Sequence, residues 1–208
     1  MKKEHYKNLR IYKELSRYSL NQLYFITNVC CDSVLNKYIM SVLKEENHFS
    51  LGNLRIDQLF IDFYTKYRNF NFYKEVVFSS CNIILDLAKD SVLSFPWNKS
   101  RLLSLFEYFI NKDSIWKEDS VNHNVIFVKP FNIFFVDGGN HSIATGRYFR
   151  KGIVHCNQMI DYSFIIKNFD FDGKFFRDFQ NHKINKPFIE ELGILFLIGK
   201  VIVERNIA

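Results

Sequence analysis

The stretch FNIFFVDGGNHSIATGRYFRKGIVHCNQ, Phe131 to Gln158, decides how this sequence is interpreted. It begins with a run of apolar and aromatic residues that ends at Asp137, which is typical of a buried strand. Gly138 and Gly139 follow, although the chain has only 8 glycines in 208 residues. The residues after them have the pattern of a short helix, which Gly152 ends. The order is therefore a strand, a glycine turn and a helix.

A glycine turn between a strand and a helix is a general device for holding an anion. Glycines let the backbone turn sharply and let a ligand approach the amide groups closely. The first amide groups of a helix have no partner within it, and the helix dipole adds about half a positive charge there. Phosphate is the usual guest of such a site. The alternative is a plain tight turn, for which Asp-Gly-Gly-Asn is also an ordinary sequence.

The polar residues around this turn are candidate site residues. We expect Asn140 to cap the helix through its side chain and Ser142 to add a hydroxyl contact. His141 is a candidate general acid or base, or a phosphate donor when protonated. Asp137 is the second candidate catalytic residue, since it can orient His141 or bind a metal, or else simply make the turn. The candidate phosphate-binding residues of the turn are Gly138, Gly139, Asn140 and Ser142.

The segment VDGGNHSIATGRYFRKGI resembles the signature of the ParB/sulfiredoxin superfamily, over about Phe95 to Ser163. In that superfamily a strand ends in a pattern like Asp-Gly-x-His-Arg, before a helix with small residues, a glycine and another strand. Gly138, Gly139 and His141 match this pattern. The resemblance implies a small mixed β-sheet packed with helices. It also implies a function directed at nucleotides or nucleic acids, because the superfamily includes nucleases, nucleotide hydrolases and toxins.

Two departures from the family pattern limit what the resemblance implies. Asn140 stands where sulfiredoxins have a reactive cysteine, so sulfinic acid reduction, which needs a thiolate nucleophile, is excluded. Ser142 stands where both branches usually have arginine, which weakens the expected phosphate clamp. Arg147, further along the same helix, or Arg101, from an upstream helix, can supply the missing guanidinium. The alternative for each arginine is a solvated surface position.

Helical patterns dominate the first 90 residues. Ser19 and Gln22 form a capping-box pattern before a long apolar stripe that continues to Val42. A second stripe covers Ile56 to Tyr67, and the spacing predicts a third helix through Ile83 to Ala88. The expected organisation is a helical accessory region, residues 1–92, and an α+β core of the ParB/sulfiredoxin type, residues 93–208, joined in one compact unit.

The second half of the chain alternates between helix and strand signals. Asn98 or Ser100 can cap a helix, and VIFVKPFNIFFV then predicts a hairpin. A further strand is expected from Ile153 to about Ile160. Pro187 suits the first turn of a final helix that is apolar nearly all round and therefore buried. Asp172 and Gly173 mark a turn between two aromatic runs.

The composition favours a soluble cytoplasmic protein with an anionic partner. The formal net charge is +6, with a pI near 9.0, and 48% of the residues are hydrophobic. No stretch is long and apolar enough for a membrane span, and no CxxC pair predicts a zinc site. Two of the acidic residues Asp161, Asp170, Asp172 and Asp178 could bind a divalent metal ion with a nucleotide, although solvated loop positions are the alternative. The sequence identifies no cofactor otherwise.

Three functions fit these patterns. The first is an enzyme that acts on a nucleotide or nucleic-acid phosphate, such as a hydrolase, a nuclease or a nucleotide-modifying bacterial toxin or defence effector. The second is a nucleotide- or DNA-binding module without chemistry. The third is a partner-binding protein whose helical region docks on an antitoxin or a larger defence complex. The first two require that the amide groups after Val136 face a ligand, whereas in the third Gly138 and Gly139 form only a turn.

Overall fold

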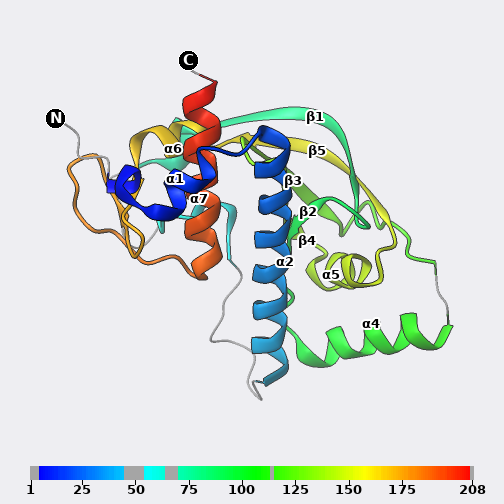
Figure 1. The fold of residues 1–208 in the computed structure, drawn as a ribbon. Helices are drawn as coiled ribbons and strands as arrows, with labels where there is room; N and C mark the ends of the chain where they lie inside the picture. The colour runs from blue at the N-terminus through cyan, green and yellow to red at the C-terminus, as the bar shows by residue number, and fades with distance from the viewer. Residues whose placement is uncertain (1–4, 45–53, 64–69, 113–114, 207–208) are drawn as a thin grey trace.

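The computed structural model describes residues 5–44, 54–63, 70–112 and 115–206, and their fold is of the α+β class, with a helical N-terminal region, as expected (Figure 1). The helices are η1 (His5–Asn8), α1 (Arg10–Leu15), α2 (Leu20–Lys44), η2 (Ile56–Gln58), α3 (Phe72–Glu75), α4 (Lys99–Lys112), α5 (Asn140–Phe149), α6 (Ser163–Asn168) and α7 (Glu190–Arg205). The strands are β1 (Val77–Asp86), β2 (Ser91–Leu93), β3 (Asn124–Lys129), β4 (Ile133–Gly138), β5 (Ile153–Asp161), β6 (Asp170–Phe171) and β7 (Phe176–Arg177).

A mixed five-stranded sheet with the order β1-β5-β3-β4-β2 forms the centre of the molecule. The expected hairpin is confirmed, because β3 and β4 pair antiparallel, with Val125 opposite Val136 and Val128 opposite Ile133. β3 also pairs with β5 in parallel, and β4 pairs with β2 in parallel. β1 lies at one edge and pairs antiparallel with β5. The central position of β3 and β4 leaves both faces of the hairpin to be covered by helices.

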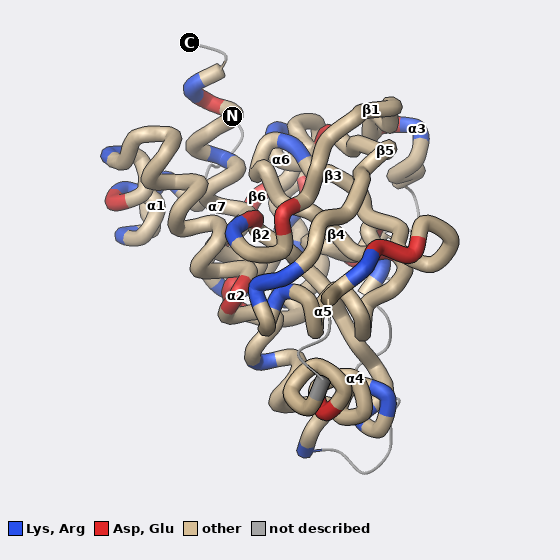
Figure 2. The backbone as a smooth tube through the Cα atoms, turned by 90° about the vertical axis from the view of Figure 1, so that its right-hand side faces the viewer, with Lys and Arg blue, Asp and Glu red and all other residues tan. Residues whose placement is uncertain are grey.

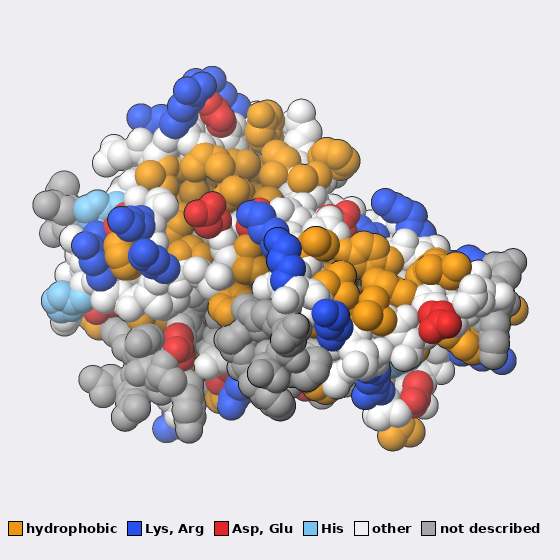
Figure 3. All heavy atoms as spheres, turned by 90° about the horizontal axis from the view of Figure 1, so that it is seen from below, with side chains coloured by type: hydrophobic (Ala, Val, Ile, Leu, Met, Phe, Trp, Pro, Cys, Tyr) orange, Lys and Arg blue, Asp and Glu red, His pale blue; other side chains and the backbone are white. Residues whose placement is uncertain are grey.

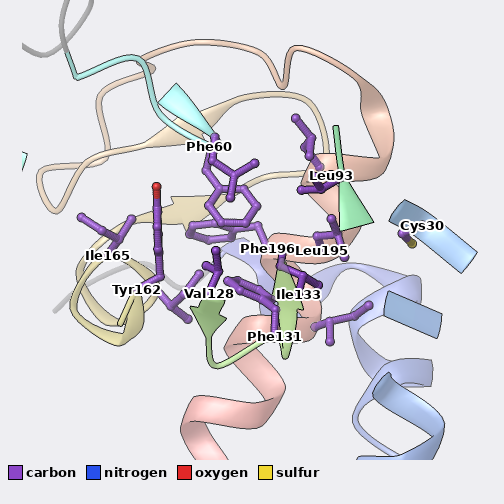
Figure 4. Packing of buried hydrophobic residues seen from close by; sticks show 14 of the residues in the cluster. Cys30, Phe60, Leu93, Val128, Phe131, Ile133, Tyr162, Ile165, Leu195 and Phe196 are labelled. Atoms are coloured by element: carbon purple, nitrogen blue, oxygen red, sulfur yellow. The ribbon is translucent and has the colours of Figure 1, made fainter. Parts of the chain in front are cut away.

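Alternate side chains of the hairpin enter two different hydrophobic clusters, as the period of a strand requires. Ile126 and Val128 belong to the larger cluster, which α2, α7 and the N-terminal segment complete. Figure 4 shows its aromatic centre, where Phe60, Phe131 and Phe196 point toward one another. Val125 and Phe127 belong to a smaller cluster with Trp116 and residues of α5. The helix α5 therefore packs on the face of the sheet opposite the larger cluster.

The prediction of a third helix from Ile83 to Ala88 was wrong, because these residues mostly lie in β1. Pairing with β5 along most of its length satisfies the backbone of β1, and Val, Phe and Ile suit a pleated sheet. An irregularity between Ser80 and Ile83 shifts the register, which hides the simple alternation of a strand. Of the second predicted helix the structure shows only the short η2, while residues 64–69 lie outside the described ranges. The larger cluster takes residues from both sides of position 93.

Several local signals gave the correct ends of helices. The Ser19 amide donates to Gln22 Oε1 at 2.8 Å, and the Gln22 amide donates to Ser19 Oγ at 3.3 Å, which is the predicted capping box. The Asn98 side chain caps α4 by accepting from the Arg101 amide at 2.8 Å. The final helix is buried along most of its length, as expected, but it begins at Glu190, so Pro187 precedes it. Local hydrogen bonding therefore determines where α2 and α4 begin.

Candidate functional site

The strand β4 passes into α5 through Gly139, which adopts a left-handed conformation with φ of 78°. The expectation that Asn140 caps the helix was wrong, because Gly139 takes the cap position and Asn140 is the first helical residue. Asn140 is buried, and its Oδ1 accepts from the Phe95 amide at 2.6 Å and from Ser94 Oγ at 3.1 Å. Its side chain therefore ties the start of α5 to the chain that follows β2 and is not directed at a ligand.

The two glycines also have a packing role. A Cβ atom at Gly139 would lie 2.5 Å from the His123 ring, and one at Gly138 would lie 2.8 Å from the Asn122 carbonyl oxygen. The His123 ring in turn stacks on Trp116, whose indole nitrogen donates to the Ser142 carbonyl oxygen at 2.9 Å. The segment before β3 therefore packs closely on the turn, and this close approach by itself requires glycine at Gly139.

His141 is buried at the start of α5, with 2% of its surface exposed. Its Nε2 accepts a hydrogen bond of 2.9 Å from the Asn98 amide, so this nitrogen is unprotonated, and its ring lies edge-on to Trp97 at 4.6 Å between centroids. Burial and, second, the positive charge of Arg101 lower the pKa of His141 to about 4. At neutral pH His141 is therefore neutral, with one nitrogen already occupied, which does not fit a general base or a cationic phosphate ligand.

The bond between His141 and Asn98 brings together the starts of two helices. Asn98 is the residue before α4, and His141 is the second residue of α5. The helices lie side by side, with α4 below α5 in Figures 1 and 2. Each helix directs its first amide groups and the positive end of its dipole toward its own start. The junction of α4 and α5 therefore combines two regions of positive potential, and the exposed Arg101 lies in the first turn of α4.

Arg147 does not face this junction, contrary to its expected role as a phosphate ligand. Its buried guanidinium donates to both carboxylate oxygens of Asp32 at 2.8 and 3.0 Å. It also donates to Asn28 Oδ1 at 2.9 Å and to the Leu87 carbonyl oxygen at 3.2 Å. These bonds join α5 to α2 and to the end of β1. Arg147 is therefore a structural residue, and of the two candidate arginines only Arg101 is exposed to solvent.

Asp137 and Ser142 lie on the more accessible parts of the turn. Asp137 is exposed and accepts a hydrogen bond of 3.2 Å from Asn124 Nδ2. Within the described residues no contact joins Asp137 to His141, so the expected pair does not form. Ser142, the third residue of α5, is half-buried. Of the candidate residues, Gly138, Gly139 and Ser142 are partly accessible, and Arg101 and Asp137 are exposed.

A second arrangement of polar groups was not predicted. His155 Nδ1 and Glu118 Oε2 lie 2.7 Å apart, and the His155 amide donates to Glu118 Oε1 at 2.8 Å. Although burial opposes its ionisation, these hydrogen bonds lower the pKa of Glu118. Both residues line a cavity of about 440 Å³ together with Asn124, the partner of Asp137. No sequence signal could have found this pair, because 37 residues separate its members.

The scattered acidic residues do not converge on a common site. Asp172 binds Arg177 and Asp178 binds His182, while Asp161 and Asp170 accept backbone amides. In the described ranges no group of three or more histidine, cysteine, aspartate or glutamate residues is placed to hold a metal ion. None of the helices described here is both long and apolar enough to cross a membrane.

Comparisons with known proteins give a family without a described activity. No curated protein and no solved structure matches the chain. The resemblance to the ParB/sulfiredoxin superfamily therefore stays a prediction. One family model matches residues 2–208. Since this match covers nearly the whole sequence, the chain belongs to the family of unknown function DUF6710.

Proposed function

We propose that the protein binds the phosphate of a nucleotide or a nucleic acid at the junction of α4 and α5. The observation that carries this proposal is the bond between His141 and Asn98, which holds two helix starts together. A helix start attracts anions through its free amide groups and its dipole, and two adjacent starts add their potentials. His141 acts here as a positioning residue, because its neutral ring joins the two turns without a charge of its own.

The side chains around the junction suit a nucleotide. Arg101 can contribute charge-assisted hydrogen bonds to a phosphate, and the Ser142 hydroxyl lies in the first turn of α5. The half-buried ring of Trp97, edge-on to His141, offers an aromatic surface on which a base can stack. The net charge of +6 and the resemblance to a superfamily of nucleotide- and nucleic-acid-directed proteins support the same partner.

We propose binding without chemistry at this junction because His141 has no free basic nitrogen on the Asn98 side and a low pKa. A phosphate-directed hydrolase is the second candidate, and the pair of His155 and Glu118 favours it. A carboxylate that holds one nitrogen of an imidazole and leaves the other toward a cavity is the usual arrangement of a general base. Four free cysteines, three of them buried, fit a reducing compartment, and we propose the cytoplasm.

The binding proposal is tested with two substitutions that reverse or add charge without harming the helices. Arg101→Glu and Ser142→Glu each place a carboxylate at the third position of a helix, where it is favourable for folding. Each should raise the Kd for a fluorescent ATP analogue or a labelled single-stranded oligonucleotide at least about tenfold, because a charge-assisted bond is lost and repulsion is added. Fluorescence anisotropy at fixed salt measures both ligands.

Lys13→Glu, on the exposed side of α1, changes the net charge as much as Arg101→Glu does and more than Ser142→Glu does, and it should change the Kd less than about twofold. Equal losses in all three variants would mean that only the overall charge matters, and the junction would not be the site. A product assay with His155→Ala separates the second candidate. Turnover that disappears in this variant while the Kd stays unchanged would replace the binding module with an enzyme.

A further inference from the structure

A groove of about 840 Å³ is formed by residues that lie outside the segments of the junction of α4 and α5. It lies among the N-terminal segment, the second half of α2, the turn after β6 and the start of α7. Its walls include the buried side chains of Tyr38, Phe171 and Leu197, while Ile11 and Phe188 are exposed at its edge. Figure 3, the view from below, shows hydrophobic side chains gathered in patches that lysine and arginine side chains border.

Positive side chains outnumber negative ones in the lining of this groove, which holds three lysines, Lys37, Lys174 and Lys186, and one carboxylate, Glu190. Lys174 and Lys186 both line it, and their ammonium groups lie 5.8 and 5.6 Å from the centre of the Phe175 ring. Within the described residues neither ammonium group forms an ion pair, whereas Lys37, on another part of the lining, is bound to Glu191 at 2.5 Å. An anion that reaches the groove therefore finds two ammonium groups without an ion-pair partner, while the Glu190 carboxylate in the same lining offsets part of their charge.

We propose that the groove binds an ionised fatty acid, with its apolar chain inside the groove and its carboxylate between Lys174 and Lys186. The volume lies within the range of about 300 to 1,000 Å³ that is typical of small-molecule sites. Buried aromatic and aliphatic side chains in the walls suit a chain of methylene groups, and the two ammonium groups select a negative head over a positive one. A soluble single-chain ligand fits a groove of this size.

The proposal is tested by measuring the Kd for dodecanoate, which displaces a fluorescent fatty acid from the full chain. Dodecanoate is used below the concentration at which it forms micelles. Decanoate should bind about sixteenfold more weakly, since each buried methylene changes the Kd about fourfold. Dodecylamine, which has the same chain and a positive head, should bind at least about tenfold more weakly than dodecanoate, because two cations repel it. Ile11→Ser, at the edge of the groove, should weaken dodecanoate a few-fold.

The double variant Lys174→Glu, Lys186→Glu should raise the Kd for dodecanoate at least about tenfold. Lys183→Glu is the matched control for Lys174→Glu and Lys186→Glu made singly, because Lys183 also lies over the Phe175 ring, at 4.9 Å, but does not line the groove. Equal effects of the control and the double variant, or equal binding of dodecylamine, would overturn the proposal. The proposal would also be overturned if dodecanoate did not bind to a parent chain whose thermal unfolding shows that it is folded. Binding of the protein only to vesicles of an anionic phospholipid would overturn it too. The Kd for ATP should stay unchanged in the double variant, so failure here is distinct from failure at α4 and α5.

Discussion

The glycine turn before α5 and the groove beside α7 are built in opposite ways. The turn and the helix α5 that follows it are continuous in the sequence, and they carry an Asn, a His and an Arg that suggest chemistry. In the structure Asn140, His141 and Arg147 are buried, and each is bound to another part of the protein. The groove is assembled from separate segments that carry no motif, yet its lysines Lys174 and Lys186 have no carboxylate partner among the described residues.

This difference teaches that a polar residue in a motif is available to a ligand only if the fold does not already use it. Burial of a polar group is costly unless a hydrogen bond compensates it, so a buried motif residue is usually paired within the protein. The buried residues Asn140, His141 and Arg147 should therefore control stability, while the accessible residues Ser142 and Arg101 should control binding. Three further experiments can break or sharpen this division.

The largest effect is expected from Arg147. Arg147→Ala leaves Asp32, Asn28 and the Leu87 carbonyl oxygen without their shared donor, so the free energy of unfolding should fall by about 3 to 4 kcal/mol. Urea unfolding measures this loss. Arg101→Ala, the exposed counterpart, should change stability by less than about 0.5 kcal/mol. If Arg147→Ala kept the stability of the parent chain and instead abolished nucleotide binding, Arg147 would belong with the residues that control binding.

The second effect is a dependence of stability on pH through His141. Its pKa is lowered in the folded protein from the ordinary 6.5 to about 4, so the unfolded chain binds a proton more readily. The stabilisation is complete above about pH 6.5 and is lost as the pH falls toward 4, by on the order of 3 kcal/mol in total.

His141→Gln keeps an acceptor for the Asn98 amide but does not titrate. The difference in unfolding free energy between pH 7 and pH 4 should therefore shrink by about that amount relative to the parent chain. His155→Gln removes an exposed imidazole that is paired with Glu118, and it shows how much a surface histidine–carboxylate pair contributes to the same pH difference. An unchanged pH profile in His141→Gln would contradict a buried, neutral His141.

The smallest effect separates close packing from backbone conformation at the turn. Gly139 and Gly173 have φ values of 78° and 92°, so alanine strains both backbones similarly. A Cβ atom at Gly139 also meets the His123 ring at 2.5 Å, whereas the nearest atom at Gly173 is Leu9 Cδ2 at 3.1 Å. Gly139→Ala should therefore cost about 1 to 3 kcal/mol more than Gly173→Ala in thermal or urea unfolding. Equal losses of stability would mean that the segment before β3 can move to make room for a Cβ atom, so that close packing does not require glycine at Gly139.

The chain itself determined the elements whose signals are local. The capping box at Ser19, the hairpin of β3 and β4, and the strand–turn–helix order around Gly139 all depend on neighbours in the sequence, and all were predicted correctly. For the cap of α4 the sequence offered Asn98 or Ser100, and the structure has Asn98. The α+β class follows from the same alternation of patterns. These features could be predicted from the sequence because a cap or a turn is stabilised mainly by interactions within a few residues.

Only the tertiary structure decided which of these residues are free. It placed β1 at the edge of the sheet by pairing it with β5, enclosed Arg147 against Asp32, and brought Glu118 to His155. It also assembled the groove from segments more than a hundred residues apart. Strand pairing, burial and ion pairing depend on groups that are distant in the chain, and their free energies arise only when the chain is compact. For that reason the sequence could name candidate residues, and the fold alone could divide them into structural residues and residues exposed to a ligand.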